Sequence, residues 1–259
     1  MIENAPLISI IMNCYNGEKY LREAINSVYA QTYQNWEIIF WDNAANDTSG
    51  DIAKSYDSKL KYYYAKKNTK LYEARNYALD KCSGEYVAFL DCDDVWLTNK
   101  IQLQMQYIKS NNVQIVATSY SVVGYDLSLL RNVYMSSCKW GFTGLLNYNY
   151  ISISSVLIRS SVIKKLRFNQ VFQLIGDLDL WLRFSMDNEI GGVNEVCQLS
   201  RQHKNNTSLI DCKMWRTERR YMCYELLKKN DIDLVKALHI IKYLIKKEVS
   251  ELKKMKNNL

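Results

Sequence analysis

The sequence predicts an α/β protein with a mostly parallel, doubly wound, Rossmann-like sheet and amphipathic helices at its C-terminal end. In the first hundred residues, apolar runs at 7–12, 36–41, 60–64 and 86–90 alternate with helix-like stretches. This repetition is typical of parallel sheets with right-handed crossovers. Two of these runs end in aspartates, as strands of open sheets do where they bind ligands. From residue 234, apolar side chains recur every three or four positions, which predicts an amphipathic helix.

Length and composition are those of an ordinary globular protein. A chain of 259 residues, 48% hydrophobic and 24% charged, is long enough for a large core and one or two domains. The net charge is +7, and residues 213–259 carry all of it, with 13 Lys or Arg against 6 Asp or Glu. We therefore predict a neutral domain over 1–212 and a basic helical extension over 213–259.

Cysteine and histidine usage argues against a zinc cluster. The seven cysteines have no paired spacing, and the two histidines are His203 and His239. We expect reduced, buried thiols and a cytoplasmic location. The N-terminus lacks a basic segment followed by a long apolar run, and no stretch approaches 18 apolar residues. We therefore expect neither a signal peptide nor a membrane-spanning helix.

Three helices are predicted between the four strands of the first half. The first has an apolar stripe over 21–28 at i, i+3, i+4 and i+7. The second is short, begins with Asp47 or Thr48 as its cap, and ends near Tyr56. The third covers 71–79 and also carries Arg75 and Asn76.

The most informative stretch follows the buried run at 86–90. Asp91, Asp93 and Asp94 place three carboxylates within four positions. Burying such charges without compensation costs roughly several kcal/mol, because they repel one another and lose hydration. At the carboxyl end of a strand, they can hold a hard divalent cation together with a phosphate. A solvated acidic turn that caps a helix is the alternative.

The second half is less regular. We expect a helix over 99–110, strands over 114–120, 151–159 and 192–200, and a helix that begins at Gly176. The Tyr-, Ser- and Leu-rich segment between the first two of these strands is not assigned. Two serines of the 151–159 strand, Ser154 and Ser155, are candidates for lining a cleft.

Several motifs, taken in order, resemble glycosyltransferase family 2, whose members have the GT-A fold. They are Ser9 to Asn16, Asp42 to Asp47, Ala74-Arg75-Asn76, Asp91-Cys92-Asp93-Asp94, Asp177 to Arg183, and Arg201-Gln202-His203 followed by Asn205 to Ser208. Each motif is weak alone, but the ordered set over residues 5–210 is specific. The resemblance divides 1–212 into a nucleotide-binding half, 1–98, and an acceptor-binding half, 99–212.

Three positions depart from the family pattern. Many members have Pro-Thr or Pro-Val at Asn13-Cys14, Asp-Asp-Gly-Ser at Asp42 to Ala45, and Glu-Asp at Gly176-Asp177. None of these departures removes a residue that the chemistry needs, although Gly176 changes the acceptor side.

The resemblance implies a nucleotide site. Asn13 and Tyr15 would lie against the nucleotide, with Tyr15 stacked on the base. Asp42 would accept the imide N–H of uracil or thymine, and Arg75 would reach the base or a phosphate. Asp91 would hold the ribose or a metal-bound water. The alternatives are core packing for Tyr15, a helix-capping turn for Asp42 and a surface charge for Arg75.

The resemblance also implies a Mg²⁺ or Mn²⁺ site. Asp93 is the first-choice ligand, Asp91 assists it, and His203 completes the metal shell or touches the diphosphate. Arg201 would bind phosphate. For Asp94, a helix cap and a role in the site are both open. A lone histidine after a strand is otherwise simply packed or exposed.

Asp177 would be the general base that removes a proton from an acceptor hydroxyl. A structural helix cap is the alternative. A helix N-terminus lowers the pKa of such a carboxyl, whereas burial and a nearby diphosphate raise it. With one base and no second nucleophile, the predicted reaction is an inverting transfer from a nucleoside diphosphate sugar, UDP-linked by preference, to a saccharide or lipid-linked acceptor. Such a reaction belongs to surface polysaccharide or glycoconjugate synthesis.

Three other functions fit the sequence less well. A sugar-phosphate nucleotidyltransferase favours a glycine-rich basic loop after the first strand, and this chain has one glycine there, Gly17. An inactive sugar-nucleotide-binding module has no need to keep Asp91, Asp93 and Asp177 together. Nucleic-acid binding is disfavoured because the chain lacks a basic groove motif that bears aromatic residues.

The basic tail predicts an amphipathic helix with two open uses. Its apolar positions are Leu234, Leu238, Ile241, Ile245, Val249 and Leu252, among many lysines. The helix either packs on the core or on a partner subunit, or it lies on an anionic membrane surface.

Overall fold

The structure, a computed structural model, describes residues 5–135, 139–148, 151–204, 206, 212–229 and 232–256. Its strands are β1 Ile8–Cys14, β2 Trp36–Asp42, β3 Leu60–Tyr64, β4 Tyr86–Phe89, β5 Val95–Trp96, β6 Ile115–Val123, β7 Leu129–Val133, β8 Lys139–Trp140, β9 Val156–Arg159 and β10 Ile190–Arg201. They form one sheet in the order β3-β2-β1-β4-β9-β6-β10-β5, with β7 beside β6 and β8 beside β10.

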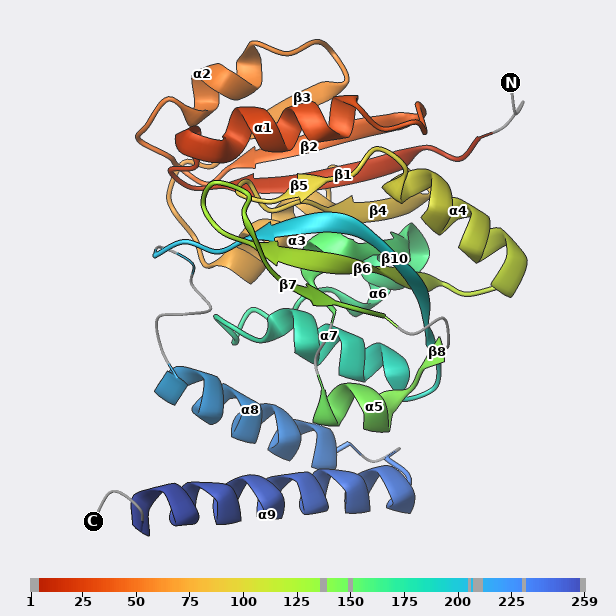
Figure 1. The fold of residues 1–259 in the computed structure, drawn as a ribbon, viewed down its shortest axis with the longest axis vertical. Helices are drawn as coiled ribbons and strands as arrows, with labels where there is room; N and C mark the ends of the chain where they lie inside the picture. The colour runs from red at the N-terminus through yellow and green to blue at the C-terminus, as the bar shows by residue number, and fades with distance from the viewer. Residues whose placement is uncertain are drawn as a thin grey trace.

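Helices cover both faces of this sheet, and two of them form an additional layer at one end of the molecule (Figure 1). The helices are α1 Glu18–Tyr29, α2 Ser49–Lys54, α3 Leu71–Leu79, α4 Lys100–Asn111, α5 Phe142–Asn147, α6 Ser160–Leu166, α7 Gly176–Ser185, α8 Cys212–Leu227 and α9 Leu234–Lys256. No helix among the described residues is long and apolar enough to cross a membrane.

The parallel half of the sheet follows the prediction. β3, β2, β1 and β4 are parallel neighbours, and Cys14 pairs with Asp42 at their carboxyl ends. Successive residues of β1 point to opposite faces. Ile10 therefore packs in the core with α1, α2 and α4, whereas Ile11 packs with α3 and α7. The carboxyl ends of β1, β2 and β4 consequently share one edge, as expected.

The second half is mixed. β9 is antiparallel to both β4 and β6, and β10 runs parallel to β6. The strand expected over 151–159 is wrong in its first part, because Ile153–Ser155 is a 3₁₀ turn and only Val156–Arg159 is a strand. The N–H and hydroxyl of Ser155 both donate to the Ser152 carbonyl, a local pattern that competes with sheet bonding. The unassigned segment holds β7, β8 and α5.

The C-terminal helices pack on the domain, but not through the predicted stripe. α9 contacts α5 and α8, and its buried residues are Ile240 and Tyr243. They join the core cluster that also contains α7. Leu238, Ile241 and Ile245 instead face away from this contact and are exposed. Val249 and Leu252 lie outside the residues whose side chains the structure describes.

Candidate active site

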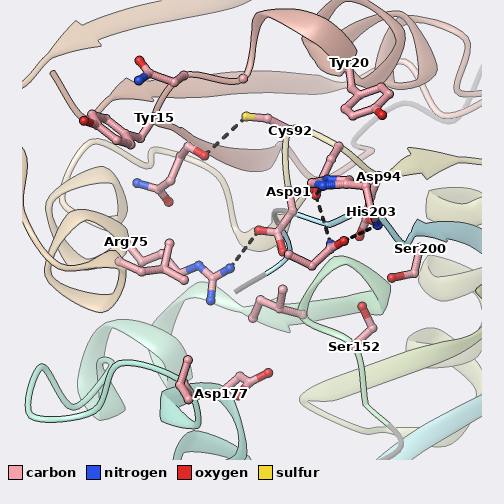
Figure 2. Close-up of a pocket in the computed structure, with 18 of the residues that line it drawn as sticks. Tyr15, Tyr20, Arg75, Asp91, Cys92, Asp94, Ser152, Asp177, Ser200 and His203 are labelled. Atoms are coloured by element: carbon pink, nitrogen blue, oxygen red, sulfur yellow. Dashed lines mark hydrogen bonds and ion pairs between the residues drawn. The ribbon is translucent and has the colours of Figure 1, made fainter. Parts of the chain in front are cut away.

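A cavity of about 520 Å³ opens at the carboxyl edge of the parallel strands. The turn after β1, the loop after β4, the beginnings of α3 and α7, and the residues after β10 line it (Figure 2). Its volume is that of an ordinary small-molecule site. Seven of the nine predicted site residues line the cavity: Asn13, Tyr15, Arg75, Asp91, Asp93, Asp177 and His203. The other two, Asp42 and Arg201, are not among its lining residues.

Arg75 and Asp91 form the centre of the cavity wall. Arg75 is 3% exposed, and its Nη2 lies 2.8 Å from Asp91 Oδ1. Burial alone would lower the pKa of Arg75, but the charges of Asp91 and Asp177 raise it overall, so the guanidinium stays cationic. The Asp91 side chain is 42% exposed, and its N–H donates to Ser154 Oγ. Arg75 is therefore not a surface charge on its helix.

Asp93 and His203 form a second polar pair on this wall. His203 Nε2 lies 2.9 Å from Asp93 Oδ2, and the imidazole stacks on the ring of Tyr20 with 5.4 Å between centroids. Burial, together with the charge of Asp91, raises the pKa of Asp93. Excess negative charge at this point would be relieved by a bound cation.

The donor set suits a hard divalent cation that shares its coordination with a substrate. No group of three or more His, Cys, Asp or Glu side chains that could hold a metal ion occurs in the described part of the chain. Mg²⁺ is commonly bound by one or two carboxylates and completed by phosphates and water. Asp93 and Asp91 are carboxylates of that kind, whereas metal ligation by His203 stays a prediction.

Arg201 and Asp94 hold the Asp91 to Asp94 loop in place through hydrogen bonds, and Asp94 also lines the cavity. Arg201 Nε donates to the Asp93 carbonyl at 2.9 Å, Nη1 donates to another carbonyl, and Nη2 pairs with Glu23. Asp94 accepts from Gln198 Nε2 and from the Arg201 N–H, so it does not cap the next helix. All three guanidinium nitrogens of Arg201 therefore have protein partners. Phosphate binding by Arg201 stays a prediction, and this geometry does not support it.

Asn13 and Tyr15 present a nucleoside-sized surface. Both polar atoms of the Asn13 side chain are buried and have no hydrogen-bond partner among the described residues. A buried amide without partners lowers stability unless a ligand satisfies it. Tyr15 is 55% exposed rather than packed in the core. The Cys92 thiol donates to the Asn13 carbonyl at 3.3 Å and ties the β1 turn to the β4 loop.

Asp42 lies behind the cavity. It is 2% exposed, Oδ2 accepts from the Tyr62 hydroxyl at 2.6 Å, and Oδ1 accepts from the Ala45 N–H at 2.8 Å. Both carboxylate oxygens therefore already have partners. Base recognition by Asp42 remains a prediction that requires a different side-chain position or backbone arrangement.

Asp177 lies on the opposite wall from Tyr15, in the first turn of α7 (Figure 2). The N-cap of the helix is Ile175, so Asp177 is not its cap. Oδ1 accepts from the Leu178 N–H at 2.8 Å and from the Tyr72 hydroxyl at 3.5 Å. Burial raises the pKa of Asp177, although Arg75 opposes the shift. A carboxylate with a raised pKa and one long side-chain hydrogen bond is suited to accept a proton.

Sequence reasoning missed several cavity residues. Tyr72 lies one helical turn before Arg75, so the i, i+3 spacing could have placed it on the same wall. Tyr20 and Asn206 support His203 and Asp93, and no local pattern marks them. Ser154 and Ser155 are fully buried, whereas Ser152, at the start of the same turn, lines the cavity.

The comparisons with known proteins agree with this architecture. The glycosyl transferase family 2 model matches residues 9–171. An uncharacterized glycosyltransferase of Haemophilus influenzae is 34% identical, over 65% of this chain and 68% of its own length. The UDP-Glc:alpha-D-GlcNAc-diphosphoundecaprenol beta-1,3-glucosyltransferase WfgD of Escherichia coli is 29% identical, over 83% of this chain and 84% of its own length.

Two further comparisons limit what can be concluded from the similarity to known proteins. The chain spans 66% of the length of a Rickettsia typhi glycosyltransferase to which it is 34% identical. The structure of S. aureus TarS 1-349 in complex with UDP-GlcNAc superposes with a TM-score of 0.77 at 18% identity, covering 92% of this chain and 71% of that one. This superposition shows the fold alone and confirms the predicted GT-A architecture. By the extent of the family match and the identity to its relatives, the chain belongs to glycosyl transferase family 2.

Proposed function

We propose that the protein is an inverting glycosyltransferase that moves a sugar from a nucleoside diphosphate sugar to a hydroxyl group of its acceptor. The observation that carries the proposal is the arrangement of one cavity. Arg75, Asp91, Asp93 and His203 line one part of it, and Asp177 faces them from the first turn of α7. A sugar bound between these walls would have leaving-group contacts on one side and a base on the other.

Asp177 would act on the acceptor. As the bond between the anomeric carbon and the acceptor oxygen forms and the bond to the diphosphate breaks, Asp177 takes the hydroxyl proton. The other carboxylates among the described cavity residues all have partners: Asp91 pairs with Arg75, Asp93 with His203, and Asp94 accepts from the Arg201 N–H. With Asp177 as the base and no carboxylate left to act as a nucleophile on the sugar, we expect a single displacement with inversion of the anomeric carbon.

The donor side would hold the nucleotide. Tyr15 offers a ring for stacking, and the Asn13 amide offers a buried donor and acceptor. Mg²⁺ or Mn²⁺ would be held by Asp93, Asp91 and His203, where it would offset the charge of the leaving diphosphate. Arg75 stays cationic beside the same group and adds a fixed positive charge.

The names of the relatives suggest the substrate class. WfgD is named for transfer from UDP-Glc to a diphosphoundecaprenol-linked sugar, and TarS was crystallised with UDP-GlcNAc. We extend these names to a UDP-linked donor and to a saccharide or lipid-linked acceptor, in synthesis of a surface polysaccharide or glycoconjugate.

The test is a screen of UDP-, GDP- and dTDP-sugars with Mn²⁺, followed by NMR of the product. We expect release of a nucleoside diphosphate and an anomeric configuration opposite to that of the donor. Release of pyrophosphate would indicate a nucleotidyltransferase instead. A product that retains the donor configuration would refute the single displacement by Asp177.

A further inference from the structure

One side of α9 has exposed apolar residues and no protein partner in the described part of the chain. Leu234, Leu238, Ile241 and Ile245 are 74%, 45%, 42% and 57% exposed. At about 100° per residue, they fall within an arc of roughly 60° on the helix surface. We call these four residues the outer stripe.

The outer stripe does not hold the helix on the domain. That contact uses Ile240 and Tyr243, which are 0% and 5% exposed and belong to the shared core. α9 therefore has two apolar faces, and only one is needed for folding. A row of large apolar side chains left in water marks an interaction surface more often than a structural one.

The charge beside the outer stripe indicates the chemistry of its partner. Lys242 and Lys246 are exposed and follow Ile241 and Ile245 directly in the sequence. They form a basic edge along the apolar row. Residues 213–259 carry the whole net charge of the chain. The complementary partner is apolar inside and negatively charged at its surface.

The position of α9 indicates what shape of partner can reach the outer stripe. Figure 1 shows α9 as the outermost element at the lower end of the molecule, with α8 between it and the α7 layer. Its 23 residues extend over about 35 Å, so a flat surface can meet the outer stripe along its length. A second copy of the chain fits less well, because stable interfaces bury roughly 800 Å² per partner and deplete lysine.

We propose that α9 docks the protein on an anionic lipid bilayer. The outer stripe enters the interface between head groups and acyl chains, and Lys242 and Lys246 contact the negative head groups. The helix lies in the plane of the membrane while Ile240 and Tyr243 keep it attached to the domain. This docking does not depend on the proposed activity, because it needs no substrate.

The experiment is co-sedimentation of the full chain with vesicles of phosphatidylglycerol or of phosphatidylcholine, at low and high salt. The variants are I241S/I245S, which removes half of the outer stripe, and K242E/K246E, which reverses the basic edge. The matched control is L129S/L130S on β7, which removes two leucines that are 62% and 54% exposed elsewhere on the protein. Melting temperatures of all variants should equal that of the wild type, since the changed residues are exposed.

We expect the wild type and the β7 control to pellet with phosphatidylglycerol vesicles and to remain soluble with phosphatidylcholine. Both α9 variants should bind phosphatidylglycerol vesicles at least tenfold more weakly than the wild type. High salt should weaken the binding of the wild type to these vesicles. The proposal is overturned if I241S/I245S pellets like the wild type, or if the control loses as much binding. It is equally overturned if the wild type does not pellet with phosphatidylglycerol vesicles. A wild type that is then a dimer, and that I241S/I245S converts to a monomer, would assign the outer stripe to a second copy of the chain.

Discussion

The two acidic turns at the sheet edge look alike in sequence and differ in use. In the turn after β2, Asp42 accepts from Tyr62 and Ala45, and Asp47 accepts from the N–H groups of Glu18 and Ser49. In the loop after β4, the side chains of Asp91 and Asp93 are 42% and 28% exposed to the cavity. The first turn uses its carboxylates to hold the chain together. In the second, two of the three carboxylates are partly exposed to the cavity.

The difference comes from the donors that the surrounding chain supplies. Partial burial opposes the shift, yet hydrogen bonds from Ser49 and from the Glu18 N–H lower the pKa of Asp47. At Asp93, burial and the charge of Asp91 raise the pKa instead. Asp91 and Asp93 also have partners, Arg75 and His203, but these partners line the same cavity, so the carboxylates stay partly exposed to it. Of the four predictions below, those for Asp93 and Asp42 test this comparison, and those for Asp177 and Lys100 extend it to carboxylates and charges elsewhere in the fold.

The largest effect is expected for Asp93→Asn. If a cation at Asp93 stabilises the leaving diphosphate by several kcal/mol, its loss should reduce turnover by about three orders of magnitude. Titration of UDP with and without Mn²⁺ should show that the variant loses the metal-dependent part of binding. Asp47→Asn is the matched control from the first turn, and its turnover should stay near that of the wild type. Full wild-type activity in excess EDTA would contradict the prediction.

Asp177→Asn should reduce kcat by a factor on the order of 10²–10⁴, because the amide keeps the shape but accepts no proton. UDP affinity and melting temperature should be unchanged. Since the pKa of Asp177 is raised, wild-type kcat/KM should fall as the pH falls through that raised value, and the variant should lack this acid limb. Asp179→Asn is the control, because Asp179 pairs with Arg183 and does not line the cavity. Near-normal turnover of Asp177→Asn would place the base elsewhere.

Asp42→Ala should lower the free energy of unfolding by about 1–3 kcal/mol, because it leaves the partly buried Tyr62 hydroxyl and the Ala45 N–H without their acceptor. Denaturant unfolding measures this loss. If Asp42 also accepts the imide N–H of the base, the variant should bind UDP and CDP equally. Tyr62→Phe separates the two roles, since it removes the internal partner and keeps the carboxylate. Unchanged preference for UDP in Asp42→Ala would refute the base contact.

The smallest effect concerns Lys100, a buried charge outside both turns. It is 0% exposed, donates to Gln104 Oε1 at 2.9 Å, and burial lowers its pKa to about 7. The unfolded lysine keeps its proton to the ordinary value of 10.5, so stability should rise with pH between about 7 and 10.5. Lys100→Met should stabilise the protein at pH 7 by at least ~1 kcal/mol and less at pH 10. An equal gain at both pH values would show that Lys100 is not buried as a charge.

The sequence by itself determined the parallel half and the place of the site. The apolar runs at 7–12 and 86–90 are strands because each is apolar on both faces, and only a doubly covered sheet buries both. Once those strands are parallel, their polar ends must share an edge. That reasoning placed the turn after the first strand and the loop that begins at Asp91 at one edge, and both line the cavity. The family resemblance, and not the sheet pattern, supplied Arg75, which lies on a helix.

The tertiary structure decided which of the predicted polar groups face a ligand and which face the protein. Arg201 and Asp42 have the residue types and positions of ligand-binding groups, yet Arg201 donates to the Asp93 carbonyl and Asp42 accepts from Tyr62, both on other segments of the chain. The orientation of α9 was equally open, because its sequence has two apolar faces and only contact with α5 and α8 selects Ile240 and Tyr243 for burial. Hydrogen-bond partners and packing faces depend on residues far apart in the chain, and a local sequence pattern does not predict which of these residues will meet.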